Sequence, residues 1–422
     1  MLCTMFDRRI LIRAKLCIMF FFITLSAILL LLCEDITISY CSLNNKAPEK
    51  FQLQLQKPRI QKAIQPTLSH VLVEEEEEDN DDDQGSQKPL IPPLNVTEKE
   101  RIAWFRKRFH DFKIFDSRSN LTRQFHARVL GLFSHGCEAQ FFMTWIYPAN
   151  LFRSRELLSV ESLFKAHPRA CLVILSRTLD SKQGYRILKP LIDRGFKVEA
   201  VTPNLPFLFH KTPAEKWLHD LRKGKKDPGE IPLSQNLSNL IRLVVLYKYG
   251  GIYLDTDFII LKPFKGLRNC IGAQSMGSVS KQWTRLNNAV LVFDKNHPLL
   301  SQFIEEFALN FDGNKWGYNG PYLVSRVVER VKEEEDGLNL TVLPPMAFYP
   351  VDWTRIGGWF QKPKNRGEAR WVKDKVIQLR GETYGVHLWN KWSGKLAIQE
   401  ESVMARLISQ HCLICSHVYN SS

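Results

Sequence analysis

Short apolar runs alternate with segments of helical periodicity through the middle of the chain. Residues 141–146, 171–175 and 197–201 are compact runs, each of a length typical of a buried strand. Between them, residues 156–164 and 185–193 carry apolar side chains at the spacing of an amphipathic helix. Strands that alternate with helices in this way predict a parallel sheet covered by helices, and therefore an α/β fold.

Residues 234–251 carry the clearest helical pattern. Ser234 is placed to cap the helix, and Gly250 and Gly251 are placed to stop it. The apolar positions recur three or four residues apart, at Leu237, Leu240, Ile241, Val244 and Val245.

A strand predicted over residues 252–254 runs directly into the acidic triplet Asp255-Thr256-Asp257. Open α/β sheets bind ligands beyond the carboxyl ends of their strands, which is where this pair falls. Two carboxylates one residue apart reach the same ion only if the chain turns there. With such a turn they suit a hard divalent cation, which can bridge the phosphates of a nucleotide diphosphate. Because the pair lies at a strand end, its removal is expected to leave the core intact.

The first forty residues differ from the rest of the chain. Residues 16–33 form an uncharged run of 18 residues, just long enough to cross a bilayer as a helix. Basic residues precede the run and two acidic residues follow it, which favours a cytosolic tail over residues 1–15 and a lumenal remainder. We therefore predict an uncleaved, single-pass type II membrane anchor, with a cleaved signal peptide as the alternative.

Residues 34–95 have the composition of a disordered stem. They contain the acidic run 74–83, a stretch rich in Gln and Lys, and several prolines, with no period that would bury surface. Residues 96–139 are predicted to lead from the stem into the folded domain, and include a basic amphipathic helix near Trp104.

Two features agree with an oxidising lumen. N-glycosylation sequons occur at five positions: Asn95, Asn120, Asn236, Asn339 and Asn420. Six cysteines follow Cys33, and they leave 15 possible pairings open. We expect Cys412 and Cys415 to form a disulfide, although their spacing also suits a redox or zinc site.

The chain is basic, with 58 Lys and Arg against 44 Asp and Glu and a formal net charge of +14. The predicted lumenal location argues against a nucleic-acid partner. The basic surface is expected to face diphosphates, acidic glycans or lipid headgroups instead.

The residues around the acidic triplet resemble glycosyltransferase family 32, the α1,4-galactosyl- and α1,4-N-acetylglucosaminyltransferases, and in particular its uncharacterised plant members. The likeness rests on residues 236–262, NLSNLIRLVVLYKYGGIYLDTDFIILK. A second block, residues 283–412, resembles the C-terminal region of the same enzymes.

The resemblance implies a GT-A fold, a Rossmann-like nucleotide-diphospho-sugar transferase domain over residues 140–415. Residues 140–280 would form its donor-binding half and residues 281–415 its acceptor-side half. The implied reaction transfers galactose or N-acetylglucosamine from a UDP-sugar to a glycan or glycolipid acceptor. It proceeds with retention of anomeric configuration and uses Mn²⁺ or Mg²⁺. Together with the predicted anchor, the resemblance places the catalytic domain in the Golgi lumen.

Family positions around the helix and the acidic triplet give the first site residues. Asp255 and Asp257 are assigned to the metal, the donor diphosphate and catalysis. Arg242 and Tyr253 are assigned to the donor. Asn239 is also assigned to the donor, but it stands where many relatives have Asp, which bears on the identity of the donor sugar.

Positions further along the chain extend the implied donor site. Asn288 lies at the opening of a strand that borders the donor in similar enzymes, and it is grouped with the catalytic residues. Asn319 and Gly320 resemble a family segment near the transferred sugar. An ordinary loop and helix start is the alternative for that segment.

His387 corresponds to a late histidine that completes the metal site in related folds. The alternative is a structural histidine within a core rich in tryptophan. Trp389 and Trp392 are candidates for stacking on a sugar or base, although we expect at least one of them to belong to the core.

Two other functions stay open on the sequence alone. A catalytically silent scaffold with the same fold is favoured by Asn239 and disfavoured by the intact acidic pair. A phosphohydrolase of the haloacid dehalogenase kind also has Asp-x-Asp after an apolar strand. Its motif requires Thr or Val two residues after the second Asp, where Ile259 stands.

Overall fold

The computed structural model describes residues 91–333 and 339–415. The predicted cytosolic tail, the membrane segment, almost all of the stem and the sequon at Asn420 lie outside these residues. Among the helices of the described part, none combines the length and the apolar character needed to span a bilayer.

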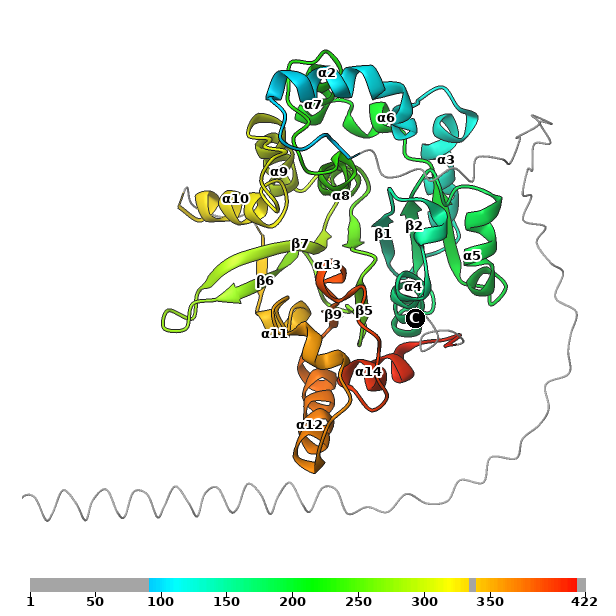
Figure 1. The fold of residues 1–422 in the computed structure, drawn as a ribbon. Helices are drawn as coiled ribbons and strands as arrows, with labels where there is room; N and C mark the ends of the chain where they lie inside the picture. The colour runs from blue at the N-terminus through cyan, green and yellow to red at the C-terminus, as the bar shows by residue number, and fades with distance from the viewer. Residues whose placement is uncertain (1–90, 334–338, 416–422) are drawn as a thin grey trace, which may run out of the picture. The chain divides into compact units, whose positions relative to one another are not determined.

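Within the described residues, a seven-stranded mixed sheet lies at the centre of the fold (Figure 1). Its strand order is β3-β2-β1-β4-β7-β6-β8. The strands are β1 (Gln140–Thr144), β2 (Cys171–Leu175), β3 (Lys197–Val201), β4 (Gly251–Leu254), β6 (Cys270–Met276), β7 (Trp283–Phe293) and β8 (Thr341–Leu343).

The predicted parallel arrangement is confirmed for four neighbouring strands of the seven. Strands β3, β2, β1 and β4 are parallel neighbours, as alternating strands and helices require. Strand β7 runs antiparallel to both β4 and β6, and β8 adds to β6 in parallel. The sequence pattern did not predict this second half, because β6 and β7 follow one another without an intervening helix.

Helices cover both faces of the sheet (Figure 1). Those from the first part of the chain are α2 (Glu98–Arg108), α3 (Asn120–Ser134), α4 (Ser154–Ala166), α5 (Lys182–Ile192), α6 (Leu205–Phe209), α7 (Pro213–Arg222) and α8 (Leu233–Tyr249). Those from the second part are α9 (Pro298–Leu309), α10 (Pro321–Glu333), α11 (Pro345–Phe348), α12 (Arg366–Glu382), α13 (Asn390–Ser393) and α14 (Val403–His411). Short 3₁₀ turns lie at η1 (Phe109–Asp111), η2 (Lys113–Phe115), η3 (Ala149–Leu151) and η4 (Ile356–Phe360).

The alternation of side chains along β1 divides the apolar interior into two layers. Phe142 packs into the layer under α7, α8, α9 and α10, whereas Phe141 and Met143 pack into the opposite layer with α4 and α5. Phe105 of α2 and Phe125 of α3 belong to the first layer. Residues before β1 therefore contribute to the same core as the sheet.

A second, two-stranded sheet lies beside the main one. It pairs β5 (Phe258–Ile260) with β9 (Gly385–His387) in antiparallel orientation. A third apolar cluster joins these strands to η4, α12 and α14. The C-terminal region is thus tied to the strand that follows the acidic triplet.

The boundaries of α8 differ from the sequence-based prediction at one end. The helix begins at Leu233 after Pro232, so Ser234 lies inside its first turn and does not cap it. The predicted stop is confirmed, since Gly250 and Gly251 adopt positive φ angles of 70° and 103°. A Cβ atom at Gly251 would lie 2.7 Å from a backbone oxygen of β1, so the close approach of these strands favours glycine.

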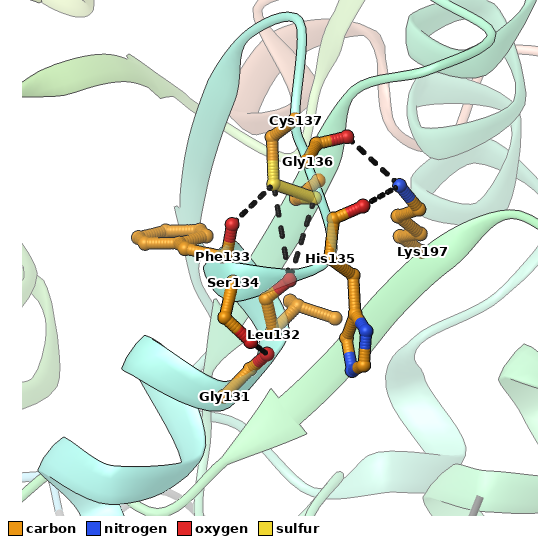
Figure 2. Close-up of a disulfide and its surroundings, with 9 residues drawn as sticks. Gly131, Leu132, Phe133, Ser134, His135, Gly136, Cys137 and Lys197 are labelled. Carbon is orange, nitrogen blue, oxygen red and sulfur yellow. Dashed lines mark hydrogen bonds between the residues drawn. A yellow bond between two sulfur atoms is a disulfide. The ribbon is translucent and has the colours of Figure 1, made fainter.

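Two disulfides are present among the described residues, and both involve cysteines that follow the predicted anchor. Cys137 pairs with Cys171 and so joins the loop before β1 to the start of β2. Figure 2 shows this bridge, with the Lys197 ammonium donating to the carbonyl oxygens of His135 and Gly136 at 2.6 and 2.9 Å.

The second disulfide joins Cys412 to Cys415, as predicted. Three backbone N–H groups of its loop, from Leu413, Ile414 and Cys415, donate to one carboxylate oxygen of the buried Glu161 at 2.7, 2.8 and 3.4 Å. Because the two sulfur atoms are bonded to each other, the zinc alternative is not the arrangement that the structure shows.

Candidate functional site

The chain turns where the acidic triplet ends β4. The Asp255 N–H still donates to the Ala289 carbonyl oxygen at 2.9 Å, which continues the pairing of β4 with β7. Thr256 and Asp257 then form a turn, and β5 begins at the next residue. The turn that the sequence argument required is therefore present.

Strand β9 brings His387 to the acidic pair. Its register with β5 sets His387 opposite Phe258, and the Leu388 N–H donates to the Asp257 carbonyl oxygen at 2.8 Å. The His387 Nε2 atom lies 3.3 Å from Asp257 Oδ1 and 4.0 Å from Asp255 Oδ2. One potential ligand atom from each of the three side chains lies within 4.8 Å of the others. Two carboxylates and one imidazole at this spacing fit a divalent cation such as Mn²⁺ or Mg²⁺.

Asp255 forms an ion pair with Arg242, a buried arginine of α8. Arg242 Nη2 lies 3.0 Å from Asp255 Oδ1, and the Tyr253 hydroxyl donates to the same oxygen at 3.0 Å. The Arg242 guanidinium also lies over the Tyr253 ring, 4.5 Å from its centre. Burial raises the pKa of the Asp255 carboxyl, which Arg242 opposes and Asp257 reinforces. Arg242 is only 3% exposed, so removal of the Asp255 carboxylate would leave a buried guanidinium without this counterion.

Asn288 and Asn239 support Arg242 from within the fold. Arg242 Nη1 donates to the Asn288 carbonyl oxygen at 2.8 Å, and Asn288 Nδ2 donates to Asn239 Oδ1 at 3.0 Å. Gly320 packs against the same amide, since a Cβ atom there would lie 2.9 Å from Asn239 Oδ1. Both asparagines are buried, and Asn288 lies in the middle of β7 rather than at its opening. The network positions Arg242 and, through it, Asp255.

The Asn319 side chain is engaged in the fold. Its Nδ2 donates to Asn236 Oδ1 at 2.9 Å and to the Asp312 carbonyl oxygen at 2.8 Å. Its Oδ1 accepts from the Asp312 N–H at 3.1 Å. These hydrogen bonds connect the loop before α10 to α8. The same contacts bury Asn236, whose sequon is enclosed by the fold.

Asp257 has different surroundings from Asp255. Its Oδ2 accepts from the Asn390 N–H, the first residue of α13, at 2.8 Å. Burial raises the pKa of the Asp257 carboxyl, but His387 and the Asn390 N–H outweigh it, so that the pKa is lowered. Burial lowers the pKa of His387, and Asp257 outweighs this effect and raises it. Among the described residues, His387 Nδ1 has no hydrogen-bond partner.

Three residues near the site were not singled out from the sequence. Asn390 lies beside His387 in the chain, and its Nδ2 donates to Glu156 Oε1 at 3.3 Å. Burial raises the pKa of the Glu156 carboxyl, and the charge of Asp257 raises it further. The Tyr349 ring lies 5.9 Å from the His387 ring. Asn390 could have been found from its place in the family-like block, whereas Glu156 and Tyr349 had no sequence signal.

The two tryptophans after His387 have different environments, as expected. Trp389 is partly buried, and its Nε1–H donates to the Val351 carbonyl oxygen at 2.9 Å. Its backbone is left-handed, with φ of 56°, which redirects the chain from β9 into α13. Trp392 is 54% exposed.

Two family models match different regions of the chain, and each region contributes residues to this site. Residues 153–277 match the glycosyltransferase sugar-binding region containing the DXD motif, which includes Asp255 and Asp257. Residues 292–419 match the alpha 1,4-glycosyltransferase conserved region, which includes His387 and Asn390. The carboxylates thus come from one matched region, and the histidine that joins them comes from the other.

Several known proteins are similar to the chain over most of the described part. Mouse lactosylceramide 4-alpha-galactosyltransferase is 33% identical over 267 residues, which are 61% of this chain and 69% of that protein. Human alpha-1,4-N-acetylglucosaminyltransferase is 26% identical over 216 residues, which are 49% of this chain and 57% of that protein. An uncharacterised protein of Arabidopsis thaliana is 31% identical over 290 residues, and the chain spans 43% of its length.

The fold and the site define a mixed α/β glycosyltransferase with a DXD region. The chain belongs to the α1,4-glycosyltransferase family, and this membership places it among the hexosyltransferases. It also removes the phosphohydrolase alternative, since both matched regions are those of glycosyltransferases.

Proposed function

We propose that this protein transfers galactose or N-acetylglucosamine from a UDP-sugar to a hydroxyl group of a glycan or glycolipid, with retention of configuration. The single observation that carries the proposal is the meeting of Asp255, Asp257 and His387 within 4.8 Å at the carboxyl end of β4. The named activities of the mouse and human relatives support the choice of donor sugars.

In this proposal, Asp255, Asp257 and His387 hold a Mn²⁺ or Mg²⁺ ion. When bound, the ion neutralises charge on the diphosphate that leaves the sugar. His387 offers Nε2, because that atom faces both carboxylates while Nδ1 points into the fold. Arg242 keeps Asp255 ionised and oriented, since its guanidinium lies behind that carboxylate.

The acceptor oxygen forms its bond to the anomeric carbon on the face from which the diphosphate departs, as the bond between that carbon and the diphosphate oxygen breaks and the hydroxyl proton passes to the departing diphosphate. This stereochemistry comes from the family resemblance. The proposed fold type, GT-A, has the same basis and agrees with ligand binding at the carboxyl ends of parallel strands.

The experiment is a transfer assay with the full-length protein, a panel of UDP-sugars and added Mn²⁺. We expect turnover with UDP-galactose or UDP-N-acetylglucosamine, its loss on chelation and its return on addition of metal. Metal-dependent UDP binding without any turnover, in the presence of a broad acceptor panel, would indicate the silent scaffold instead.

We also propose that the protein is a single-pass type II protein of the Golgi membrane, with residues after 33 in the lumen. Asn95, Asn120 and Asn339 are exposed and available for glycosylation, whereas Asn236 is buried. Glycosidase treatment of the protein made in cells should lower its mass, with Asn95 or Asn339 as the principal sites. An unchanged mass would contradict the lumenal location.

A further inference from the structure

Three exposed tryptophans gather from distant parts of the chain. Trp316 lies in the loop between α9 and α10, Trp353 follows α11, and Trp392 lies in α13, with exposures of 52%, 40% and 54%. The Trp353 and Trp392 rings stack at 4.9 Å with an angle of 26° between their planes. We call Trp316, Trp353 and Trp392, together with Lys391, the indole cluster.

Lys391 connects the two parts of the indole cluster. Its Nζ atom lies 3.3 Å from the centre of the Trp316 ring and 5.7 Å from the Trp392 ring. These cation–π contacts bring Trp316 and the stacked pair to one ammonium group. Large aromatic side chains that share one exposed location commonly mark a binding surface.

The cluster adjoins the acidic pair through α13. The Asn390 N–H donates to Asp257 at 2.8 Å, and Trp392 is two residues further along the same short helix. Two residues of helix advance the chain by roughly 3 Å. Trp392 therefore belongs to the same short helix as the backbone N–H that contacts Asp257.

The backbone under the stacked pair is well fixed. Asp352 Oδ1 accepts from the N–H groups of Thr354 and Arg355 at 2.9 and 3.1 Å, which closes a turn around Trp353. Arg155 Nη1 donates to the Ser393 carbonyl oxygen at 2.7 Å at the end of α13. A surface that is rigid before binding loses little entropy when a ligand arrives.

These features suit a sugar better than a hydrocarbon or a flat protein surface. An indole face carries negative charge density, and one face of a pyranose presents several weakly positive C–H groups to it. The ammonium group of Lys391 can donate hydrogen bonds to hydroxyl groups, whereas it would be costly to cover with an acyl chain. A single pyranose covers about one indole, and the cluster offers more than one exposed indole near Lys391.

We propose that the indole cluster is the acceptor subsite and that it binds a neutral oligosaccharide of at least two sugar units. This inference rests on the proposed transferase function, because the cluster's place beside the acidic pair would set the acceptor near the donor. No acidic sugar is needed, since Lys391 is already engaged with an aromatic ring.

The test is binding of the full-length protein in detergent to an array of neutral and acidic oligosaccharides. We expect retention by neutral disaccharides and longer glycans. Trp392→Ala and Trp316→Ala should each reduce this retention roughly 10-fold, and Trp392→Phe should keep part of it. In the transfer assay the same variants should raise the acceptor KM more than they lower kcat.

Trp371→Ala is the matched control, because Trp371 on α12 is also about half exposed and lies outside the indole cluster. It should bind the array as the unaltered protein does. The inference is overturned if no neutral oligosaccharide is retained, or if Trp392→Ala and Trp316→Ala retain as much as the control.

A separate titration with UDP and Mn²⁺ distinguishes this failure from failure of the proposed function. If UDP binds but glycans do not bind through the tryptophans, the proposed function still stands and the acceptor subsite is overturned. Glycan binding through the tryptophans without UDP binding would overturn the proposed function and leave a glycan-binding surface that is not an acceptor subsite.

Discussion

Asp255 and Asp257 are one residue apart, yet the fold treats them differently. Asp255 faces the buried, permanently charged Arg242 of α8, which belongs to the same matched region of the chain. Asp257 faces His387 and the N–H of Asn390, which belong to the C-terminal matched region. The first carboxylate is paired with an arginine of its own matched region, whereas the second contacts residues of the C-terminal matched region.

This difference indicates two separate roles for the supporting residues. Arg242 has a folding role as well as an electrostatic one, because an unpaired guanidinium at its position would be buried. His387 is nearly as buried, but it can exist as a neutral ring, so it can be changed at lower cost. Substitutions should therefore separate stability from metal binding.

The largest expected effect is on transfer itself. Asp255→Asn and Asp257→Asn should each lower kcat/KM by about a thousandfold, since each removes a charge aimed at the departing diphosphate. Metal-dependent UDP binding, measured by calorimetry, should fall in both. Only Asp255→Asn should also lower the melting temperature clearly, because it leaves Arg242 without its counterion. Equal melting temperatures for the two variants would contradict the comparison.

Replacement of Arg242 should act mainly on folding. Arg242→Ala should lower the free energy of unfolding by about 3 kcal/mol, because the Asp255 carboxylate then loses its buried partner. Chemical denaturation of the lumenal fragment measures this value. Arg118→Ala is the control, since the Arg118 side chain is 92% exposed and should contribute less than about 0.5 kcal/mol.

His387 should show the opposite behaviour. His387→Gln should weaken Mn²⁺ binding by roughly 10- to 100-fold while the melting temperature changes little. His210→Gln on the exposed surface serves as the control. A large fall in melting temperature with unchanged metal affinity would instead assign His387 to the core.

The smallest effect concerns Asn239. Asn239→Asp introduces the acid that the family resemblance leads us to expect at this position, and the new carboxylate can still accept from Asn288 Nδ2. We expect the ratio of transfer from UDP-galactose and UDP-N-acetylglucosamine to change by a factor of less than about 10. An unchanged ratio would show that Asn239 does not determine which donor sugar the protein uses.

Local patterns predicted the strands and helices up to Gly250 well. Residues 171–175 and 197–201 form strands with the expected bounds, and the helix before Gly250 ends where expected. These elements are encoded by nearby residues. The turn at the acidic triplet also followed from the chemistry that two adjacent carboxylates require.

Long-range pairing was beyond the reach of such patterns. The antiparallel neighbours of β7 and the pairing of β5 with β9 depend on tertiary contacts between runs that look alike in sequence. The same is true of Arg242 with Asp255 and of Asn390 with Asp257, which is a contact across 133 residues. His387 was placed near the pair only because the family resemblance supplied its position.

The division between the two carboxylates also sets an order of events during synthesis. Ribosomes add roughly 5 to 20 residues per second, so the 133 residues between Asp257 and Asn390 take roughly 7 to 27 s to appear. In the later part of that interval, α8, β4 and β7 have been made, and Arg242 can pair with Asp255 and Asn288. Asp257, in contrast, still lacks its histidine and its backbone donor. A nascent chain therefore acquires the structural half of its acidic motif well before the half that would hold an ion, and a chain interrupted before residue 385 lacks the second half altogether.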